Sequence, residues 1–421
     1  MKKKKIGILT FHRSINTGAY IQCYALSRQL ERDFPDAEVE IIDYCTKRVV
    51  ENYTYKWFVF LFRDLKRSKY GAGSDRALKK LSKRILSLAR HPELLSVRKR
   101  EWDLFKRDWE RLPLSQERLI TDDCDAFQKF VRHKYDVIIA GSDCIWQYES
   151  YPFPNAYFLS GELGAVKMSY AGCAYHMDLN IMDDSDKEYM RSALNNFYYL
   201  GIRDTETQVF LRGLKLDIQS HHNCDPAFLL DVNDIPVSLT KLREKLENTG
   251  VDFTKKIVGL QVNYELIGKM VREAVNDEYQ IVAIRKHNKY ADIFIEDLTP
   301  LEWARVFSFF SVTITDFFHG TIVSLKNGTW PISIDTEFGN KNRNSSRLYD
   351  LMKRLGMQDY YYQLNKNSIV DTIWLHTALK RIMDNNIHKN LIQIIDEEKH
   401  YYLDFKDVLK QVLQEDIDED H

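Results

Sequence analysis

Polar side chains that could bind or activate a substrate follow several apolar segments of this sequence. Gly141, Ser142 and Asp143 come directly after one apolar run, and Arg203 and Asp204 come after another. Such runs are typical of buried strands in parallel sheets, whose carboxyl ends carry the ligand contacts. A guanidinium there suits bidentate binding of a carboxylate or phosphate. The structural alternatives are Asp143 as a helix cap and an ion pair between Arg203 and Asp204.

A histidine completes a similar pattern further along the chain. Asp316, His319 and Gly320 follow an apolar run over 312–315, where a helix is expected to begin. A histidine in this position can donate to an anion and can act as a general acid. A single histidine is more often structural, but its place after a strand, shared with the motifs above, favours the functional interpretation.

The amino-terminal loop offers a further anion site. Asn16 and Gly18 lie between an apolar run over 6–11 and a segment with helical spacing over 19–30. Gly18 permits close backbone approach, and helix N-termini attract anions. A simple turn would also explain a single glycine. Asp225, which precedes a proline, is interpreted as structural.

These motifs require two series of alternating strands and helices. Alternation of this kind indicates parallel sheets with crossover helices. We predict strands in the first series at 6–11, 39–44, 136–140, 167–172 and 198–202. We predict strands in the second series at 257–262, 280–284, 312–315 and 331–334, with helices at 264–274, 300–309 and 321–327.

The expected fold is therefore α/β, with two Rossmann-like, doubly wound domains facing a cleft. The N-terminal domain is expected over 1–235, and it carries a basic helical insertion at about 47–111. The second domain is expected over 250–365, and helices over 366–421 could return to the first domain. Open parallel sheets bind ligands outside their carboxyl ends, so the active site is expected in the cleft.

Composition excludes several classes of protein. The chain has 421 residues, 13% aromatic residues and a formal net charge of −1, which argues against disorder and against a nucleic-acid partner. No signal peptide or spanning segment is visible. The six cysteines show no paired spacing, so we expect reduced thiols, no metal site and a cytoplasmic protein.

The insertion over 47–111 has an unusual local charge. It holds 19 Lys or Arg against 8 Asp or Glu. Leu78, Leu81, Ile85 and Leu88 fall at helical spacing, with basic residues on the other faces. A basic amphipathic helix can lie on an anionic membrane surface, here the inner face of the membrane. The alternative is a solvated helix packed on its own domain or paired with the acidic segment 396–421.

Together these motifs resemble the polysaccharide pyruvyl transferase family, over most of the chain from residue 6 to about 356. The resemblance is carried by Asn16-Thr17-Gly18-Ala19, Gly141-Ser142-Asp143-Cys144-Ile145-Trp146, Ser169-Tyr170-Ala171, Ile202-Arg203-Asp204, the segments 224–230 and 315–321, and Asn344-Ser345-Ser346-Arg347. It implies a glycosyltransferase B-type fold. It also implies transfer of the pyruvyl group of phosphoenolpyruvate onto two hydroxyls of a sugar, forming a cyclic ketal during surface-polysaccharide biosynthesis.

The resemblance also implies roles for particular residues. His319 is expected to act as the acid or as a partner of the phosphate, and Asp143 as a base toward a sugar hydroxyl. The donor would be bound by Asn16, Gly18, Arg203, Arg285, Lys286, Gly320 and Arg347. No cofactor or metal is required, and the acceptor is a saccharide that could be lipid-linked. The chain departs from the family at Phe317, where an arginine is usual; Arg285 or Arg347 supplies that cation, or the donor differs.

Two rival functions remain open from the sequence. The same architecture would support a nucleotide-sugar glycosyltransferase, because fold alone does not determine chemistry. Glu296 and Asp297 are poor candidates for the carboxylate pair that would bind its sugar nucleotide. A basic adaptor without enzymatic activity would instead bind membranes or nucleic acid in a salt-sensitive way.

Overall fold

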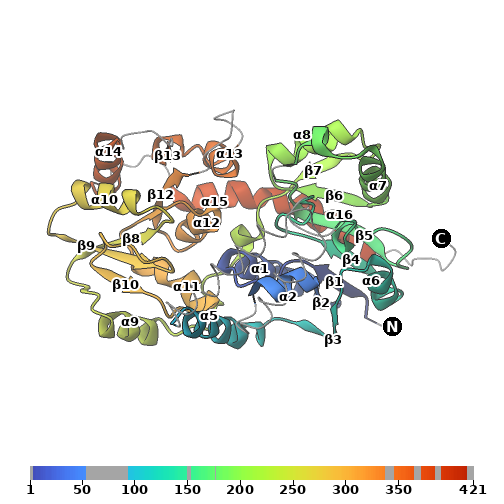
Figure 1. The fold of residues 1–421 in the computed structure, drawn as a ribbon, viewed down its shortest axis with the longest axis horizontal. Coiled ribbons are helices and arrows are strands. Elements are labelled where there is room, and N and C mark those ends of the chain that lie inside the picture. Colours follow the sequence, from blue (N-terminus) through green and yellow to red (C-terminus); the bar gives the residue numbers. More distant parts are fainter. Residues whose placement is uncertain are drawn as a thin grey trace, which may run out of the picture.

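The computed structural model describes residues 3–53, 93–148, 153–175, 177–336, 346–364, 371–384 and 390–414. Two parallel sheets lie side by side, each accompanied by helices (Figure 1). This arrangement confirms the predicted α/β fold with two Rossmann-like halves.

The first sheet is built around a reversal of strand order. Its strands run in the order β3-β2-β1-β4-β5-β6-β7. Because β1 pairs with β2 on one side and with β4 on the other, the loops after β1 and β4 open next to each other. The strands are β1 (Lys5–Leu9), β2 (Glu38–Cys45), β3 (Leu114–Ile120), β4 (Val137–Ala140), β5 (Val166–Gly172), β6 (Tyr199–Ile202) and β7 (Ser220–His222).

The second sheet repeats this arrangement. Its order is β10-β9-β8-β11-β12-β13, and β8 lies between β9 and β11. The loops that follow β8 and β11 are therefore neighbours, as those after β1 and β4 are in the first sheet. The strands are β8 (Lys256–Gln261), β9 (Tyr279–Ile284), β10 (Ile293–Ile295), β11 (Val312–Thr315), β12 (Trp330–Asp335) and β13 (Tyr361–Gln363).

Helices connect the strands and cover the sheets. Thr299 and Pro300 begin α11 as the sequence suggests, since Thr299 accepts from the backbone and Glu302 completes a capping box. The helices of the first half are α1 (Thr17–Asp33), α2 (Lys47–Tyr53), α5 (Glu93–Trp109), α6 (Cys124–Val131), α7 (Asp184–Asn195) and α8 (Thr205–Leu214). Those that follow are α9 (Leu239–Asn248), α10 (Glu265–Ala274), α11 (Pro300–Val306), α12 (Phe318–Lys326), α13 (Arg347–Arg354), α14 (Thr372–Met383), α15 (Leu391–Lys399) and α16 (Leu403–Gln414).

The two halves share one apolar core. A single cluster of buried side chains runs from the first sheet through α1 into the second sheet, and a smaller one covers the other face of the first sheet. Helix α1 packs against α11. Asp108 of α5 accepts a hydrogen bond from the backbone N–H of Leu301 at 2.8 Å, so a buried carboxylate also joins the halves.

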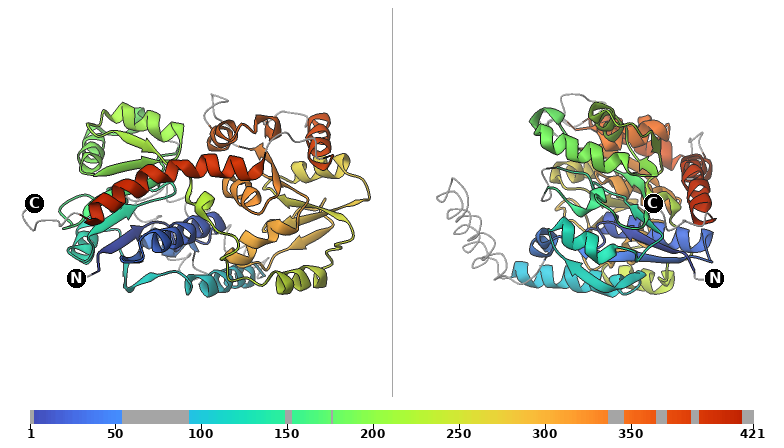
Figure 2. Two further views of the ribbon diagram at one scale, coloured as in Figure 1. Left: turned by 180° about the vertical axis from the view of Figure 1, so that it is seen from behind. Right: turned by 90° about the vertical axis from the view of Figure 1, so that its right-hand side faces the viewer.

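The C-terminal helices bridge the molecule from behind. Seen from that side, α15 and α16 run from the second half toward the first (Figure 2). Phe405 packs against Tyr170 and Tyr199, with ring centroids 4.8 and 5.4 Å away. Lys406 forms an ion pair with Asp33 at 2.7 Å. The return toward the first sheet that the sequence left open is thus made by these helices.

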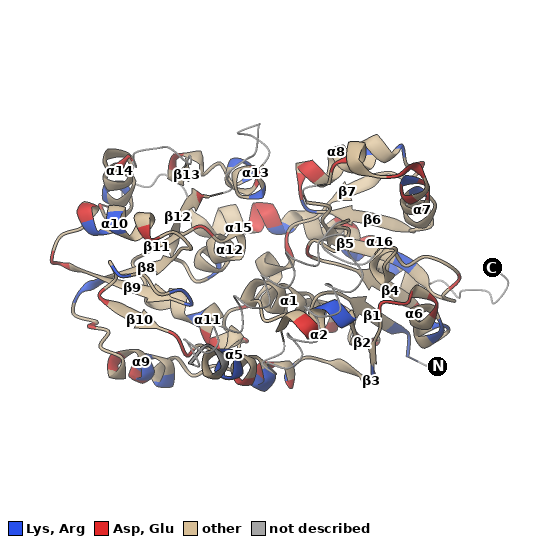
Figure 3. Ribbon diagram, in the orientation of Figure 1, with Lys and Arg blue, Asp and Glu red and all other residues tan. Residues whose placement is uncertain are grey.

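The basic insertion is described only in part. Leu78, Leu81, Ile85 and Leu88, with the basic residues around them, fall in 54–92, outside the described residues, and membrane attachment stays a prediction. The described helix α5 contacts α11, and Arg100 forms ion pairs with Glu296 at 2.7 Å and Asp297 at 3.2 Å. Basic and acidic residues both occur along the ribbon of α5 (Figure 3). Within the described ranges, no helix combines the length and apolar character needed to cross a membrane.

Candidate active site

A cavity of about 640 Å³ opens where the loops from the two sheets meet. Its walls come from the loops and helix N-termini after β1, β4, β9 and β11, from the last residue of β8, and from α2, α5, α11 and α13. It is therefore the cleft that the sequence predicts. Its lining contains every predicted site residue except Arg203, namely Asn16, Gly18, Asp143, Arg285, Lys286, His319, Gly320 and Arg347.

The loop after β1 is shaped by Asn16 and Gly18. Asn16 caps α1, because its side-chain oxygen accepts from the backbone N–H groups of Gly18 at 2.9 Å and Ala19 at 3.3 Å. These two amides are therefore already bound, which weakens the predicted anion site. A Cβ on Gly18 would lie 2.2 Å from Nδ1 of His319. The close approach that this glycine permits is thus to a side chain of the second half.

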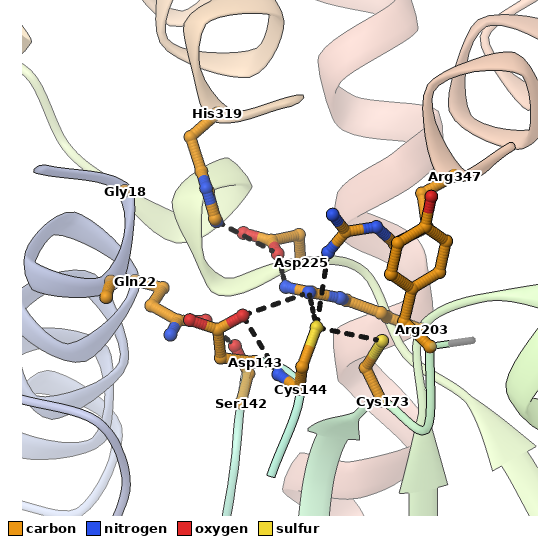
Figure 4. Close-up of polar contacts among 12 residues, drawn as sticks. Gly18, Gln22, Ser142, Asp143, Cys144, Cys173, Arg203, Asp225, His319 and Arg347 are labelled. Atoms are coloured by element: carbon orange, nitrogen blue, oxygen red, sulfur yellow. Dashed lines mark hydrogen bonds and ion pairs between the residues drawn. The ribbon is translucent and has the colours of Figure 1, made fainter. Parts of the chain in front are cut away.

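Arg203 lies behind the cavity wall. The sequence had predicted instead that its side chain would face the cleft. Its side chain is 1% exposed and forms ion pairs with Asp225 at 2.7 Å and Asp143 at 3.3 Å (Figure 4). The alternative ion pair with Asp204 is not formed, because Asp204 caps α8 by accepting from the backbone N–H of Thr207. Arg203 is therefore a buried support for two carboxylates.

Asp143 is held in an uncommon conformation at the end of β4. Its φ is 80°, and its Oδ1 accepts from the backbone N–H of Cys144 at 2.9 Å. It is not the helix cap that the alternative suggested. Burial opposes ionisation of this carboxyl, but Arg203 and His319 outweigh burial and hold the pKa of Asp143 below its usual range. It is therefore an ionised hydrogen-bond acceptor in the cavity wall.

Asp225, interpreted from the sequence as structural, belongs to the site. It caps the turn Pro226–Leu229 by accepting from the backbone N–H of Ala227. Its Oδ2 also lies 2.7 Å from Arg203 Nη1 and 3.5 Å from His319 Nε2. Burial would raise the pKa of Asp225, but His319 and Arg203 lower it strongly. The sequence signal for this role was the segment 224–230, which is part of the family resemblance and contains Asp225.

His319 is the second half's contact with this network. It is the second residue of α12, and its side chain is 15% exposed. Its Nε2 faces Asp225 without a hydrogen bond to any described residue, whereas the other side of the ring covers Gly18. The ring is thus fixed between the halves and keeps a nitrogen near the cavity.

The N-terminus of α12 supplies a further polar element. Among the described residues no side chain caps this helix, whose N-cap position is Phe317. A Cβ on Gly320 would lie 2.6 Å from Thr315 Oγ1, so this glycine allows the first turn to sit directly over the end of β11. First-turn backbone N–H groups without a side-chain cap are suited to an anion.

Two cations approach the cavity from the end of β9. Arg285 has a φ of 64°, and its ion pair with Glu101 is long, at 3.9 Å. Its guanidinium carbon lies 5.5 Å from the ring centroid of Phe105. Burial lowers the pKa of Arg285. Lys286, the next residue, also lines the cavity, so both cations of this segment lie where a ligand in the cavity could reach them.

Asp316 was not among the predicted site residues, although it lies in the same motif as His319. It lines the cavity and accepts from the backbone N–H of Asn263 at 2.8 Å. Burial raises the pKa of Asp316 to about 6, against the lowering effect of its hydrogen bonds. A carboxyl with such a pKa can carry a proton near neutral pH, which suits acid–base chemistry.

Arg347 closes the site from α13. Its guanidinium carbon lies 3.9 Å from the ring centroid of Tyr175, and its Nη1 lies 3.3 Å from Cys144 Sγ. Cys144 Sγ is in turn 3.5 Å from Cys173 Sγ. The sequence placed Arg347 in the site but gave no indication of this pair of thiols, because the two cysteines are far apart in the chain.

Similar solved structures support the fold. The UDP-GlcNAc 2-epimerase from Methanocaldococcus jannaschii has a TM-score of 0.54 and 13% identity, covering 97% of this chain and 99% of the epimerase. The UDP-GlcNAc 2-epimerase from Neisseria meningitidis has a TM-score of 0.51 and 8% identity, covering 97% and 100%. Both structures share the arrangement of two facing halves with this chain. This similarity confirms the predicted glycosyltransferase B-type fold.

Comparison with curated protein sequences gives no match. A family model does match, and it extends over residues 16–337. This range contains Asn16 at its start and the His319 motif near its end, so it includes most of both walls of the cavity. The family is described as polysaccharide pyruvyl transferase, and the chain belongs to it.

Proposed function

We propose that this transferase moves the pyruvyl group of phosphoenolpyruvate onto two hydroxyls of a sugar, forming a cyclic ketal during surface-polysaccharide biosynthesis. The observation that carries the proposal is the composition of the cavity. Arg285, Lys286 and Arg347 lie with His319 beside a helix N-terminus that no described side chain caps. Phosphoenolpyruvate carries a carboxylate and a phosphate, and such a cavity offers both groups fixed donors.

The donor would bind mainly to the wall formed by the second half. Arg285 and Lys286 approach from β9, His319 and the first turn of α12 from β11, and Arg347 from α13. The usual family arginine is replaced by Phe317, and Arg285 and Arg347 both reach the cavity to replace its charge. Arg203 acts indirectly in this scheme, because it is buried behind Asp143.

Proton transfer would involve Asp316 and His319. In ketal formation the methylene carbon of the donor gains a proton, a sugar hydroxyl attacks the adjacent carbon, phosphate leaves, and a second hydroxyl closes the ring. Asp316, with a pKa of about 6, is our choice as the proton donor. His319 would stabilise the departing phosphate.

Asp143 would orient the attacking sugar hydroxyl. It lines the cavity on the first half, opposite the cations of the second half. Its lowered pKa makes it a weak base but a stable acceptor for a hydroxyl hydrogen bond. The two hydroxyl protons would then pass to phosphate and to Asp316, which restores the acid for the next turnover.

The test compares two products. The purified chain is incubated with phosphoenolpyruvate and saccharide acceptors, and separately with nucleotide sugars, and the release of phosphate or of nucleotide is measured. Acceptor-dependent release of phosphate, with an acceptor that gains one pyruvyl group, supports the proposal. Release of nucleotide without release of phosphate would overturn it in favour of the nucleotide-sugar glycosyltransferase. In that alternative Glu296 and Asp297 are no ready nucleotide ligands, because Arg100 binds both.

A lipid-linked acceptor would place the enzyme at the cytoplasmic face of a membrane, and we propose that the basic insertion binds there. Helix α5 exposes Lys99, Lys106 and Arg107. Each basic residue near an anionic surface contributes about 1 kcal/mol. Sedimentation with anionic but not neutral vesicles, reversed by high salt, is expected. Equal sedimentation with both kinds of vesicle would contradict this attachment.

A further inference from the structure

Two cysteines from separate segments meet at the wall of the cavity. Cys144 follows β4 and Cys173 follows β5, and their sulfur atoms lie 3.5 Å apart (Figure 4). All six cysteines of the chain are described, and all are free thiols. The contact between Cys144 and Cys173 therefore joins two reduced sulfurs.

The backbone around this pair is fixed at the spacing of neighbouring strands. Asp143 and Gly172 form a parallel bridge, and the backbone N–H of Cys173 donates to the carbonyl of Asp143 at 3.1 Å. The backbone N–H of Trp146 donates to the carbonyl of Cys173 at 3.2 Å. Neighbouring strands lie about 5 Å apart, which falls within the range of Cα separations that a disulfide spans.

The two thiols have different surroundings. Cys144 lines the cavity and lies 3.3 Å from Arg347 Nη1 and 3.9 Å from Arg203 Nη2. A hydrogen bond from Cys173, together with Arg347, lowers the pKa of Cys144. Cys173 is completely buried, and burial raises its pKa. One thiol is therefore accessible and activated, and the other is protonated beneath it, as in a pair where one attacks and the other resolves.

We propose that Cys144 and Cys173 are an oxidisable dithiol in the active-site wall, a site of modification by peroxides, and that their disulfide disables the cavity. The Cys144 thiolate attacks hydrogen peroxide, the O–O bond breaks, and a sulfenic acid forms while the departing hydroxide takes up the proton that the Cys144 thiol had released and becomes water. The Cys173 thiol then loses its proton and attacks the Cys144 sulfur, which forms the disulfide and releases a second water. The two thiols lose two electrons to the peroxide, and all hydrogen atoms leave in water.

Oxidation would act on the site through Arg347. In the reduced state the guanidinium of Arg347 lies beside the Cys144 sulfur. A disulfide holds its sulfurs about 2.05 Å apart, so the two sulfurs must approach each other by about 1.5 Å in total, and the negative charge available from a thiolate is lost. Arg347 then loses a partner that fixes it in the cavity. This property goes beyond the proposed transfer reaction, since it concerns any anionic ligand that Arg347 helps to bind.

The test maps the disulfide directly. The full chain is treated with hydrogen peroxide, remaining thiols are alkylated, and peptides are identified by mass before and after reduction with dithiothreitol. We expect a linked pair of Cys144 and Cys173 peptides that reduction separates. We also expect reaction of Cys144 with a small alkylating agent roughly tenfold faster than that of Cys124, the other half-buried thiol.

Three variants separate the roles. Cys173→Ser should leave a sulfenic acid on Cys144 that dimedone captures, Cys144→Ser should leave none on Cys173, and Cys124→Ser should form the disulfide as the natural chain does. Peptide mapping of the natural chain keeps the test valid if a serine variant fails to fold. Peroxide treatment that leaves Cys144 and Cys173 unlinked, with Cys124 oxidised as readily, would overturn the proposal.

A binding measurement connects the disulfide to the site. The shift in melting temperature caused by phosphoenolpyruvate is compared for the reduced, the oxidised and the re-reduced protein. Loss of the shift on oxidation and its return on reduction support the proposed effect on the cavity, and an equal shift in all three states would overturn that effect. A disulfide that forms in a protein whose reduced state shows no shift would support the dithiol and contradict phosphoenolpyruvate as the donor.

Discussion

The two walls of the cavity differ in how their charges are neutralised. On the first half, Arg203 is enclosed by Asp225 at 2.7 Å and Asp143 at 3.3 Å. On the second half, the one described carboxylate that pairs with Arg285 is that of Glu101, at 3.9 Å, and Asp316 has its pKa raised to about 6. The first wall is a closed network of ion pairs, whereas the second keeps groups whose charge is incompletely balanced.

This difference suggests separate tasks: the first wall holds side chains in position, and the second wall provides the groups for binding and chemistry. Buried, paired charges are costly to disturb and hold their neighbours in place, but they have little capacity left for a ligand. Groups that are partly desolvated and incompletely neutralised gain the most interaction energy when a ligand of opposite charge binds or a proton is transferred. His319 connects the two walls, because it belongs to α12 and faces Asp225.

The largest effect is expected when the closed network is opened. Arg203→Ala leaves Asp225 and Asp143 buried without their cation, so the free energy of unfolding should fall by about 3–5 kcal/mol. Urea unfolding measures this loss. Arg285→Ala is the matched control from the second wall, and it should reduce donor binding while changing stability by about 1 kcal/mol or less. If Arg203→Ala unfolds like the natural chain, the network is not what holds this wall.

A comparable loss, in turnover rate rather than in stability, is expected when His319 of the second wall is replaced. His319→Ala removes the group proposed to stabilise the departing phosphate, so turnover should fall on the order of 10²–10³-fold, or about 3–4 kcal/mol. Steady-state release of phosphate measures the rate, and thermal unfolding checks that the variant is still folded under the assay conditions. His287→Ala, an exposed histidine of the same half, should keep normal turnover. A His319→Ala protein with unchanged turnover would move the role to another residue.

A smaller effect should depend on pH. The pKa of Asp316 is about 6 in the folded protein against 3.8 for an ordinary aspartate, so folding favours its protonated form. Its contribution to stability is complete below pH 3.8 and is lost as the pH rises through 6. The shift corresponds to about 3 kcal/mol, because one pH unit corresponds to about 1.4 kcal/mol.

Asp316→Asn should remove this dependence. Relative to the natural chain, the variant should gain stability between pH 4 and pH 7, as measured by urea unfolding at several pH values. Turnover of the natural chain should fall above about pH 6 as the proposed acid ionises. A constant difference in stability between the two proteins across this range would contradict the raised pKa.

The sequence predicted the interior of both sheets and missed their edges. All nine predicted strands are present, because each is a buried apolar run. The missed strands β3, β7, β10 and β13 are the four edge strands of the two sheets, where polar or short segments suffice: β3 is Leu-Ser-Gln-Glu-Arg-Leu-Ile. No apolar pattern distinguishes such a segment from a loop, because its pairing is determined by the neighbouring strand.

From the sequence, the site could be predicted only as a set of residues that follow the ends of strands. Position after a strand end correctly brought Asp143 and His319 to one cavity. The same rule misplaced Arg203, because side-chain burial depends on which carboxylates other loops supply, here Asp225. The pairing of Cys144 with Cys173 was hidden for the same reason, since it arises from strand adjacency rather than from spacing in the sequence.

The smallest expected effect tests the contact between the two walls. Gly18→Ala places a Cβ 2.2 Å from His319 Nδ1, so the imidazole must move away. Stability should change little, because alanine is favoured over glycine inside helix α1 by about 1 kcal/mol and offsets part of the clash. Turnover should fall on the order of 10–100-fold, since a displaced group loses its alignment with the reacting atoms.

In the His319→Ala background, where the clashing ring is gone, Gly18→Ala should cost nothing further in turnover. Measuring phosphate release for both single variants and the double variant gives the coupling. Additive losses would show that Gly18 acts on the cavity independently of His319 and that the two walls are not joined through this contact.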